Sequence, residues 1–312
     1  MSNVIEVEGL TKDYQQLRAL NNLTFQVRQG EILGLLGPNG SGKSTAINCM
    51  LSLLRFGSGS VKIFGKEMRP DAFDIKRRLG VVFQDVAVFD ELTVAQNLDY
   101  FCGLYISDKA ERAKKIEAAV KLVGLQDYLK FRPKQLSGGL LRRLNLACGI
   151  AHQPDLIFLD EPTVAVDPQS RNNILDGIVT LRDRGATVVY TTHYMEEVEQ
   201  ICDRIIILDK GEIIAQGTIN QLKQLSDIEE KVTLQGVELP PELKEKLEND
   251  PQIESVTSRN RTVQLVYRHG QNHVSALISQ LSQTGVSYES IYSERPTLND
   301  VFLQLTGKEL RD

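Results

Sequence analysis

The chain has 312 residues, of which 41% are hydrophobic and 25% are charged. These fractions are ordinary for globular proteins and argue against a disordered or collagen-like chain, while the length favours one large domain with a smaller one attached. The net charge of -5 includes no basic excess, so the composition argues against a long nucleic-acid-binding surface, and we expect no nucleic-acid partner.

The first part of the chain alternates short apolar, β-rich runs with helix-like segments. We expect strands over residues 32–36, 81–83, 157–159 and 188–190. Between residues 84 and 136 helical periodicity replaces the β signal, and Asp108 with Glu111 resembles a capping box, so we expect a helical subdomain over about residues 85–150. This pattern predicts an α/β fold, a largely parallel sheet with helices on both faces.

A second block of elements follows a helical stretch that ends near Ser226. We expect helices over 241–248 and 272–283, a closing helix from Thr297 to Gly307, and strands over residues 231–234, 253–258, 263–267 and 286–292. The sequence therefore predicts two domains, residues 1–226 and a small α+β accessory domain over residues 227–312.

Residues 37–44 match the pattern G-x-x-x-x-G-K-[ST] between an expected strand and an expected helix, the context in which this P-loop binds phosphate. Glycines without a Cβ atom allow backbone N–H groups to turn toward the phosphates, and the helix N-terminus adds positive potential. In this motif the lysine reaches the β- and γ-phosphate oxygens and the serine hydroxyl ligates Mg²⁺. We therefore expect nucleotide contacts from Gly37, Pro38, Asn39, Gly40, Ser41, Gly42, Lys43, Ser44 and Thr45.

Asp160 and Glu161 follow an apolar run, at the strand end where open α/β sheets bind ligands. We expect Asp160 to hold Mg²⁺ and Glu161 to orient and polarise the attacking water. A metal-bound carboxylate is too stabilised as an anion to accept a proton, whereas its neighbour on the strand points elsewhere. The P-loop upstream favours this function over an ordinary strand end.

Leu136, Ser137, Gly138 and Gly139 precede a helix-forming segment and resemble the signature of ATP-binding-cassette (ABC) proteins. A Ser hydroxyl and Gly amides at a helix N-terminus form a second anion site. In this family the signature completes the γ-phosphate site of a partner subunit. The resemblance therefore implies a P-loop ABC nucleotide-binding domain that binds ATP, and a head-to-tail dimer in which Ser137, Gly138 and Gly139 contact the partner's ATP.

Four further residues occur in the order that the ABC family implies. Tyr14 resembles the aromatic residue that stacks on adenine, and Gln84 resembles the glutamine that touches Mg²⁺ and water. Asp167 resembles the aspartate that signals across the dimer, and it also fits an N-cap followed by proline. His193 resembles the switch histidine that contacts the γ-phosphate. The resemblance implies catalysis by Glu161, His193, Gln84 and Lys43, and metal ligation by Ser44, Gln84 and Asp160.

Two positions depart from the family pattern. Leu140 replaces a glutamine that many ABC signatures carry, which puts in doubt a polar contact to the partner's nucleotide but leaves Ser137 and Gly139 in place. Ala165 replaces a glycine, so we expect a tight turn there to be less available. Neither change removes a catalytic group, so we expect both composite sites of the dimer to be active.

The sequence also predicts where the chain acts. Gly, Pro or a charged residue interrupts every apolar run before it reaches the roughly 18 residues of a membrane-spanning helix. The first residues carry acids where a secretion signal has a basic start and an apolar core. Four scattered cysteines lack metal-ligand spacing, so we expect buried, reduced thiols in a cytosolic protein: Cys49, Cys102, Cys148 and Cys202.

The segment TTHYMEE around His193 and the end PTLNDVFLQLTGKEL resemble ATPase subunits of ABC-2 type exporters, including the daunorubicin-resistance type. The resemblance implies an ATPase that drives export of a drug, lipid or other amphiphile through a separate transmembrane permease, at the cytoplasmic face of the membrane. A non-transporting soluble ABC ATPase and the ATPase subunit of an importer remain alternatives. A GTPase or small-molecule kinase is disfavoured, because no guanine-reading motif is present and the signature helix would be unexplained.

Overall fold

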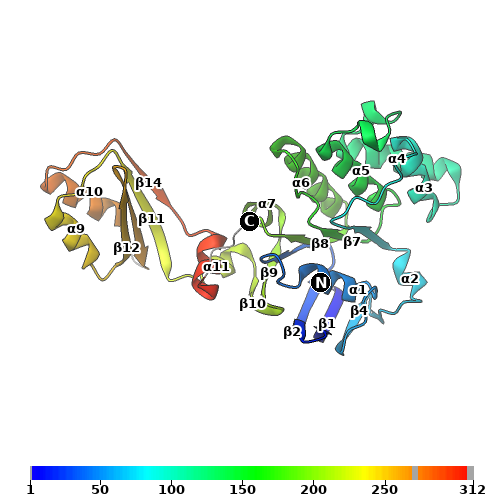
Figure 1. Ribbon diagram of the computed structural model, residues 1–312, viewed down its shortest axis with the longest axis horizontal. Helices are drawn as coiled ribbons and strands as arrows, with labels where there is room; N and C mark the ends of the chain where they lie inside the picture. Colours follow the sequence, from blue (N-terminus) through cyan, green and yellow to red (C-terminus); the bar gives the residue numbers. More distant parts are fainter. Residues whose placement is uncertain (1, 269–272, 308–312) are drawn as a thin grey trace. The chain divides into compact units, whose positions relative to one another are not determined.

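The computed structural model describes residues 2–268 and 273–307. The chain divides into two compact units, one that reaches Thr218 and one that begins at Ile219 (Figure 1). The sequence placed the division after Ser226. The helix between these points, α8 (Ile219–Lys223), packs against α11 (Leu298–Thr306), so its contacts place it in the second unit.

A six-stranded sheet forms the centre of the first unit (Figure 1). Its strand order is β10-β9-β3-β8-β7-β6, and every neighbouring pair is parallel except β10 with β9. The strands are β3 (Ile32–Leu36), β6 (Leu79–Val82), β7 (Leu156–Asp160), β8 (Thr187–Thr192), β9 (Arg204–Asp209) and β10 (Glu212–Gly217). The expected parallel sheet is confirmed, although β6 begins and ends earlier than the predicted 81–83.

Helices cover both faces of this sheet. Leu33 and Leu35 of β3 share an apolar cluster with α1 (Lys43–Met50), whereas Gly34, which faces the other way, lies against α7 (Met195–Ile201). The close approach of α7 requires glycine, since a Cβ at residue 34 would lie 2.8 Å from Cys202 Sγ. All residues of β3, β7 and β8 are buried as a result.

A second, antiparallel sheet packs over α1, and the sequence analysis did not predict it. Its order is β2-β1-β4-β5, with β1 (Asn3–Tyr14), β2 (Leu17–Arg28), β4 (Ser58–Ile63) and β5 (Lys66–Glu67), and the short helix α2 (Phe73–Lys76) follows. Apolar residues of β1 and β2 form one cluster with Ile47 and Met50 of α1 and with Phe158 of the central sheet. The helix behind the P-loop is therefore held between two sheets.

The segment between β6 and β7 is helical, as expected. It contains α3 (Val94–Gly103), α4 (Lys109–Val123) and α5 (Gly138–Ile150), which pack on one another, with 3-10 turns at Gln126–Tyr128 and Pro133–Gln135. Asp108 caps α4 by accepting a hydrogen bond from Glu111 N at 2.7 Å. The Glu111 carboxylate lies 3.6 Å from Lys115 Nζ, so only the Asp108 half of the expected capping box forms.

The second unit is a βαββαβ domain with a split βαβ, or ferredoxin-like, topology. Its antiparallel sheet has the order β12-β13-β11-β14 and comprises β11 (Ile228–Gln235), β12 (Ile253–Arg259), β13 (Thr262–Arg268) and β14 (Ser290–Glu294). Leucines of α9 (Pro241–Glu248) and α10 (His273–Gln283) share one core with the alternate residues of β11 and β13. Both helices thus cover the same face of the sheet (Figure 1).

The structure corrects one strand of this unit and confirms its closing helix. β14 does not span 286–292, because its partner β11 turns away at Gly236, where φ is 71°, and the ladder starts at the pair Gln235 and Ser290. The predicted start of α10 at Asn272 lies outside the described residues. α11 begins at a Thr297 capping box and ends at Gly307, as predicted.

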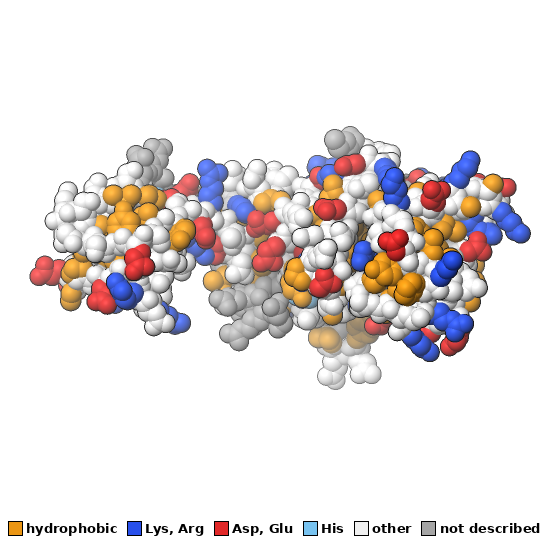
Figure 2. All heavy atoms as spheres, turned by 90° about the horizontal axis from the view of Figure 1, so that it is seen from above, with side chains coloured by type: hydrophobic (Ala, Val, Ile, Leu, Met, Phe, Trp, Pro, Cys, Tyr) orange, Lys and Arg blue, Asp and Glu red, His pale blue; other side chains and the backbone are white. Residues whose placement is uncertain are grey.

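Charged side chains of both signs are interspersed over the face shown in Figure 2. No helix among the described residues is long and apolar enough to cross a bilayer. The four cysteines are all buried and unpaired in disulfides, as expected for structural thiols.

Candidate functional site

The P-loop connects β3 to α1 through a backbone path that only glycine allows at two positions. Gly42, directly before α1, has a φ of 107°, and a Cβ there would lie 2.8 Å from Ala19 O. A Cβ at Gly37 would lie 2.3 Å from Leu208 O. The first paired N–H near the helix start is that of Ala46, which donates to Gly42 O at 2.8 Å, so the N–H groups of residues 43–45 remain at the open helix end. The loop therefore presents donors and positive potential to an anion.

Lys43 is buried at the base of this loop and is 4% exposed. Its Nζ donates to Gly37 O at 2.8 Å and Pro38 O at 3.2 Å, and it lies 3.2 Å from Glu161 Oε1. The Ser41 hydroxyl is also buried, and it has no hydrogen-bond partner among the described residues. An ammonium and an unpaired buried hydroxyl beside an open helix end fit a phosphate ligand.

Asp160 ends β7 and Glu161 follows it, and their side chains are directed to different partners. Asp160 Oδ1 accepts a hydrogen bond from Thr191 Oγ1 at 2.6 Å, whereas Glu161 lies near Lys43 and near His193, whose Nδ1 is 3.4 Å from Glu161 Oε2. Glu161 has a φ of 48°, a left-handed conformation, and its N–H donates to Thr191 Oγ1 at 3.0 Å. The turn at Glu161 separates the two carboxylates, so they can hold different roles, as the sequence analysis expected.

A cavity of about 450 Å³ opens over the P-loop. Of the predicted residues, the following line it: Tyr14, Asn39, Gly40, Gly42, Lys43, Ser44, Thr45, Gln84 and Glu161. Four residues that the sequence analysis missed also line it: Leu17, Arg18, Ala19 and Lys210. The first three lie on the β1–β2 hairpin. A prediction of two paired strands around Tyr14 would have placed them beside the cavity.

Gln84 joins the cavity to the helical segment. Gln84 comes after β6 and lines the cavity. Its backbone carbonyl oxygen accepts a hydrogen bond from Arg142 of α5. Three residues later, Ala87 N donates to Asn145 Oδ1 at 3.0 Å. Burial lowers the pKa of Arg142. Two hydrogen bonds thereby join the segment from Gln84 to Ala87 to α5.

Ser137, Gly138, Gly139 and Asp167 do not line the cavity but lie together elsewhere in the first unit. Ser137 caps α5 and accepts from Leu140 N at 3.3 Å, while Gly139 packs closely on the start of α6 (Pro168–Asp183). Asp167 caps α6 by accepting from Ser170 N at 2.9 Å, and the hydrogen bonds from Ser170 lower the pKa of Asp167. The expected N-cap at Asp167 is confirmed, and the signature lies at the start of α5, outside the lining of the cavity over the P-loop.

The two departures from the family pattern have limited structural effect. The cap of α5 uses the backbone N–H of Leu140, which any residue supplies. Ala165 adopts a φ of 59° although it is not glycine. The turn therefore forms with alanine, at a cost of about 1 kcal/mol relative to glycine.

Two family models match this chain in the regions that the geometry singles out. The model of the ABC transporter matches residues 20–164, and the model of the C-terminal domain of DrrA1-3-like ATP-binding proteins matches residues 217–306. The first match contains the P-loop, the signature, and Asp160 and Glu161, and the second contains the ferredoxin-like unit.

Curated proteins resemble the chain over almost its full length. The linearmycin resistance ATP-binding protein LnrL of Bacillus subtilis (strain 168) is 34% identical over 99% of this chain and 100% of that protein. The daunorubicin/doxorubicin resistance ATP-binding protein DrrA of Streptomyces peucetius is 34% identical over 100% of this chain and 94% of that protein. The Nod factor export ATP-binding protein I of Ralstonia nicotianae is 34% identical over 99% and 95%.

Solved structures resemble the first unit. The dimeric structure of a bacterial ABC transporter cassette is 28% identical, with a TM-score of 0.63, and the match covers 69% of this chain and 98% of that chain. A second dimeric cassette structure, of a post-hydrolysis state bound to ADP and Pi, matches with the same scores. The chain therefore belongs to the DrrA-like family of ABC transporter ATP-binding proteins, and it is the ATP-hydrolysing subunit of an ABC exporter.

Proposed function

We propose that two copies of the chain associate head to tail, so that Ser137, Gly138 and Gly139 of one copy complete the nucleotide site of the other. The supporting observation is the separation of two anion-binding helix ends: α1 lines the cavity over the P-loop, whereas the start of α5 does not. One nucleotide in this cavity cannot use both ends of the same chain. Similar solved cassettes are dimeric, which agrees with this arrangement.

Within each site we assign separate binding roles to the cavity residues. Tyr14 is 41% exposed at the end of β1 and presents its ring for stacking on adenine. Residues 37–45 hold the phosphates through backbone N–H groups and Lys43. We assign to Asp167 the link between the signature of one copy and the site of the other. Asp167 caps α6, and Gly139 of the signature packs against this same first turn of α6.

Mg²⁺ fits the oxygen donors of this site. Among the described residues no group of three or more His, Cys, Asp or Glu side chains forms a metal cluster, and Mg²⁺ typically uses one or two carboxylates together with phosphates and water. We assign Ser44, Asp160 and Gln84 as its protein ligands. When bound, Mg²⁺ neutralises charge on the phosphate oxygens.

We assign general-base and water-positioning roles to Glu161. Its carboxylate is paired with Lys43 here, and phosphate oxygens of bound ATP would compete for that ammonium, which leaves Glu161 to accept a proton from water. We assign the γ-phosphate contact to His193, whose Nδ1 is 3.4 Å from Glu161 Oε2. Gln84 follows β6 and lines the same cavity, and it would sense both water and permease.

We propose further that a separate permease carries an amphiphilic cargo, as the resistance and export proteins named above suggest, and that the chain acts at the cytoplasmic face of the membrane. ATP-driven closure of the dimer would move the permease, and hydrolysis would reopen it. The helical segment offers apolar surface for this contact, since large side chains there are exposed: Phe89, Tyr100, Leu104, Tyr105 and Phe131.

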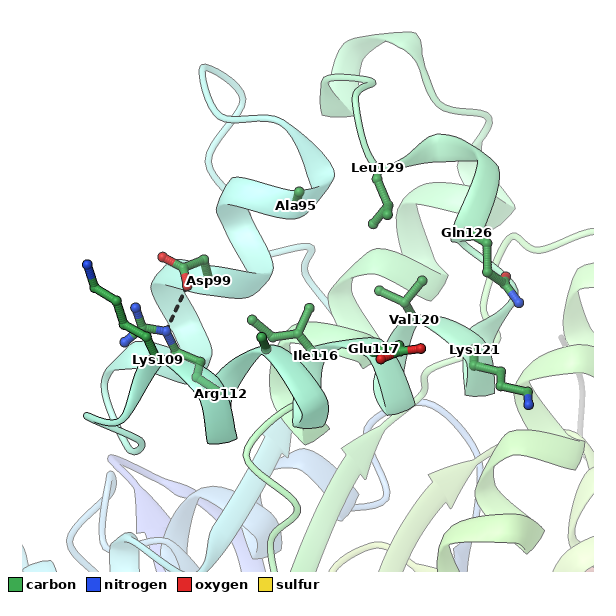
Figure 3. A pocket seen from close by; sticks show the side chains of 11 residues that line it. Ala95, Asp99, Lys109, Arg112, Ile116, Glu117, Val120, Lys121, Gln126 and Leu129 are labelled. Carbon is green, nitrogen blue, oxygen red and sulfur yellow. Dashed lines mark hydrogen bonds and ion pairs between the residues drawn. The ribbon is translucent and has the colours of Figure 1, made fainter.

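The helical segment also has a cleft between α3 and α4, lined by none of these five side chains, and we propose it as a docking site for a permease helix (Figure 3). Its volume is about 630 Å³, and Ile116 and Val120 of α4 point toward Ala95 and Leu129 across it. Charged residues, including the ion pair of Arg112 with Asp99, lie along its rim. An apolar floor with a charged rim suits an amphipathic helix laid into a groove.

The test of the composite site is ATP-dependent dimerisation. Glu161→Gln should bind ATP without hydrolysing it, and it should elute as a dimer with saturating MgATP and as a monomer without it. Adding Ser137→Arg should abolish the dimer without weakening ATP binding to the monomer, because Ser137 does not line the cavity. The matched control is Ser282→Arg on the exposed side of α10. A monomeric Glu161→Gln protein in MgATP, even with its permease supplied, would sink the proposal.

A further inference from the structure

The carboxylate of Glu197, on α7, is buried and outside the cavity over the P-loop. Its Oε2 accepts hydrogen bonds from Tyr190 Oη and from Thr192 Oγ1, both at 2.7 Å, and the residue is 2% exposed. Burial, and secondly the charge of the Glu197 carboxylate, raises the pKa of Tyr190 well above its ordinary value, so the phenol stays protonated and donates its hydrogen bond. A buried carboxylate is costly unless such partners hold it.

Thr192 connects this carboxylate to the turn that carries His193. The Thr192 hydroxyl has one proton, which it donates to Glu197, and its oxygen accepts from Tyr194 N at 3.0 Å. His193 lies between the two bonded residues, and its ring centroid is 4.1 Å from that of Tyr194. The backbone on both sides of His193 is thus fixed by one hydroxyl that depends on Glu197.

A second connection runs from Glu197 to α6. Arg171, in the first turn of α6, places Nε 3.5 Å from Glu197 Oε1 and stacks its guanidinium 4.7 Å from the ring centroid of Tyr194. The N–H of Arg171 donates to Asp167 O at 2.9 Å. The ring of Tyr194 therefore contacts both the His193 ring and the guanidinium of Arg171, whose helix is capped by Asp167.

We propose that Glu197 is a positioning residue for ATP hydrolysis, which holds the His193 turn within reach of Glu161 and couples it to the Asp167 end of α6. This inference rests on the proposed role of His193. Glu197 does not touch the nucleotide site, so its removal affects the chemical step through the placement of His193. Misplacement of a catalytic group by about 1 Å costs up to about a hundredfold in rate.

The experiment compares two buried threonines of β8, both 1% exposed. Thr192→Val removes the hydroxyl that joins Glu197 to Tyr194, whereas Thr187→Val removes the hydroxyl that accepts from Gly30 N at 3.0 Å at the far end of the strand. Thr192→Val loses two hydrogen bonds and Thr187→Val loses one, so both should lower stability, the first by more. Only Thr192→Val should lower kcat, by about tenfold to a hundredfold, with an unchanged KM for ATP.

A double-mutant cycle identifies the route of the effect. Thr192→Val added to His193→Ala should lower kcat no further, because a turn without the imidazole has nothing left to position. Glu197→Gln keeps an acceptor oxygen but removes the charge that faces Arg171, and it should lower kcat less than Thr192→Val. The full-length chain is used throughout, with phosphate release and thermal unfolding measured on each variant.

Three outcomes overturn the inference. Equal loss of kcat in Thr192→Val and Thr187→Val makes the network merely structural. Losses that multiply in the double variant show that Thr192 acts by a route other than His193. A His193→Ala protein with normal kcat removes the proposed role of His193 itself, which distinguishes that failure from the first two.

Discussion

Gly138 and Gly139 begin α5 side by side, yet the structure predicts opposite consequences for an added methyl group. A Cβ on Gly138 would meet no atom of the described residues within 4 Å. A Cβ on Gly139 would lie 2.4 Å from Ser170 Oγ and 2.7 Å from Ser170 Cβ. Neither glycine has a left-handed φ, so alanine is conformationally allowed at both positions. Only Gly139 has a packing reason within the chain to be glycine.

The two substitutions should therefore differ in stability. Gly138→Ala should raise the free energy of unfolding by about 0.5 kcal/mol or leave it unchanged, because alanine is the better helix former and restricts the unfolded chain. Gly139→Ala should lower it by about 1–3 kcal/mol, because rotation of Ser170 relieves the contact with its Oγ but not the contact with its Cβ. A unit of this size loses about 2–4 °C in melting temperature per kcal/mol.

The effect of Gly138→Ala on ATP hydrolysis should differ from its effect on stability, because the variant should stay folded but lose activity. In the proposed dimer, the open side of Gly138 faces the nucleotide of the second copy, and a methyl group there blocks the approach of backbone to phosphate. We expect Gly138→Ala to lose at least about tenfold in kcat while its melting temperature is maintained. Phosphate release at saturating MgATP and thermal unfolding measure the two quantities.

The matched control is Gly57→Ala. Its Cβ would make an ordinary contact, 3.6 Å from Thr11 O, and its φ is not left-handed. This variant should keep both activity and stability. A Gly138→Ala protein as stable and as active as the unmodified chain would refute the assignment of Gly138 to a composite site.

Three further predictions concern ionisable and paired groups. Burial lowers the pKa of His152 to about 4 from 6.5, so between these pH values the unfolded chain binds one proton more than the folded chain. The free energy of unfolding should therefore fall by up to roughly 3 kcal/mol as the pH drops through this range. Urea unfolding of His152→Phe should lack this contribution to the pH dependence. Burial raises the pKa of Cys148 to about 12, so mass spectrometry should find it unalkylated by iodoacetamide at neutral pH until the chain unfolds. Asp300→Ala leaves Lys231, 23% exposed, without its carboxylate, and chemical unfolding should show a loss of about 2 kcal/mol confined to the second unit, with ATP hydrolysis by the first unit retained.

Local sequence was sufficient for the P-loop, the carboxylates of β7 and most helices, because each depends on a short pattern with its own physical cause. Lys43 must follow glycines that open the loop, and Asp160 must end a buried strand. Caps at Asp108, Asp167 and Thr297 were also predictable, since a side chain three residues or fewer from its target needs no tertiary partner. The ferredoxin-like unit was recognisable as strands and helices for the same reason.

Long-range contacts decided the rest. The β1–β2 sheet was missed because its alternation is interrupted by register shifts, and its partner β4 lies far along the chain. The end of β14 was misplaced because strand limits follow the ladder with β11 rather than β-propensity. Nothing in the letters around Glu197 indicated that its carboxylate joins β8 to α6, since that depends on three segments meeting in a buried place. Patterns within a few residues determine which groups are available for chemistry, whereas burial and packing between distant segments determine what each group touches.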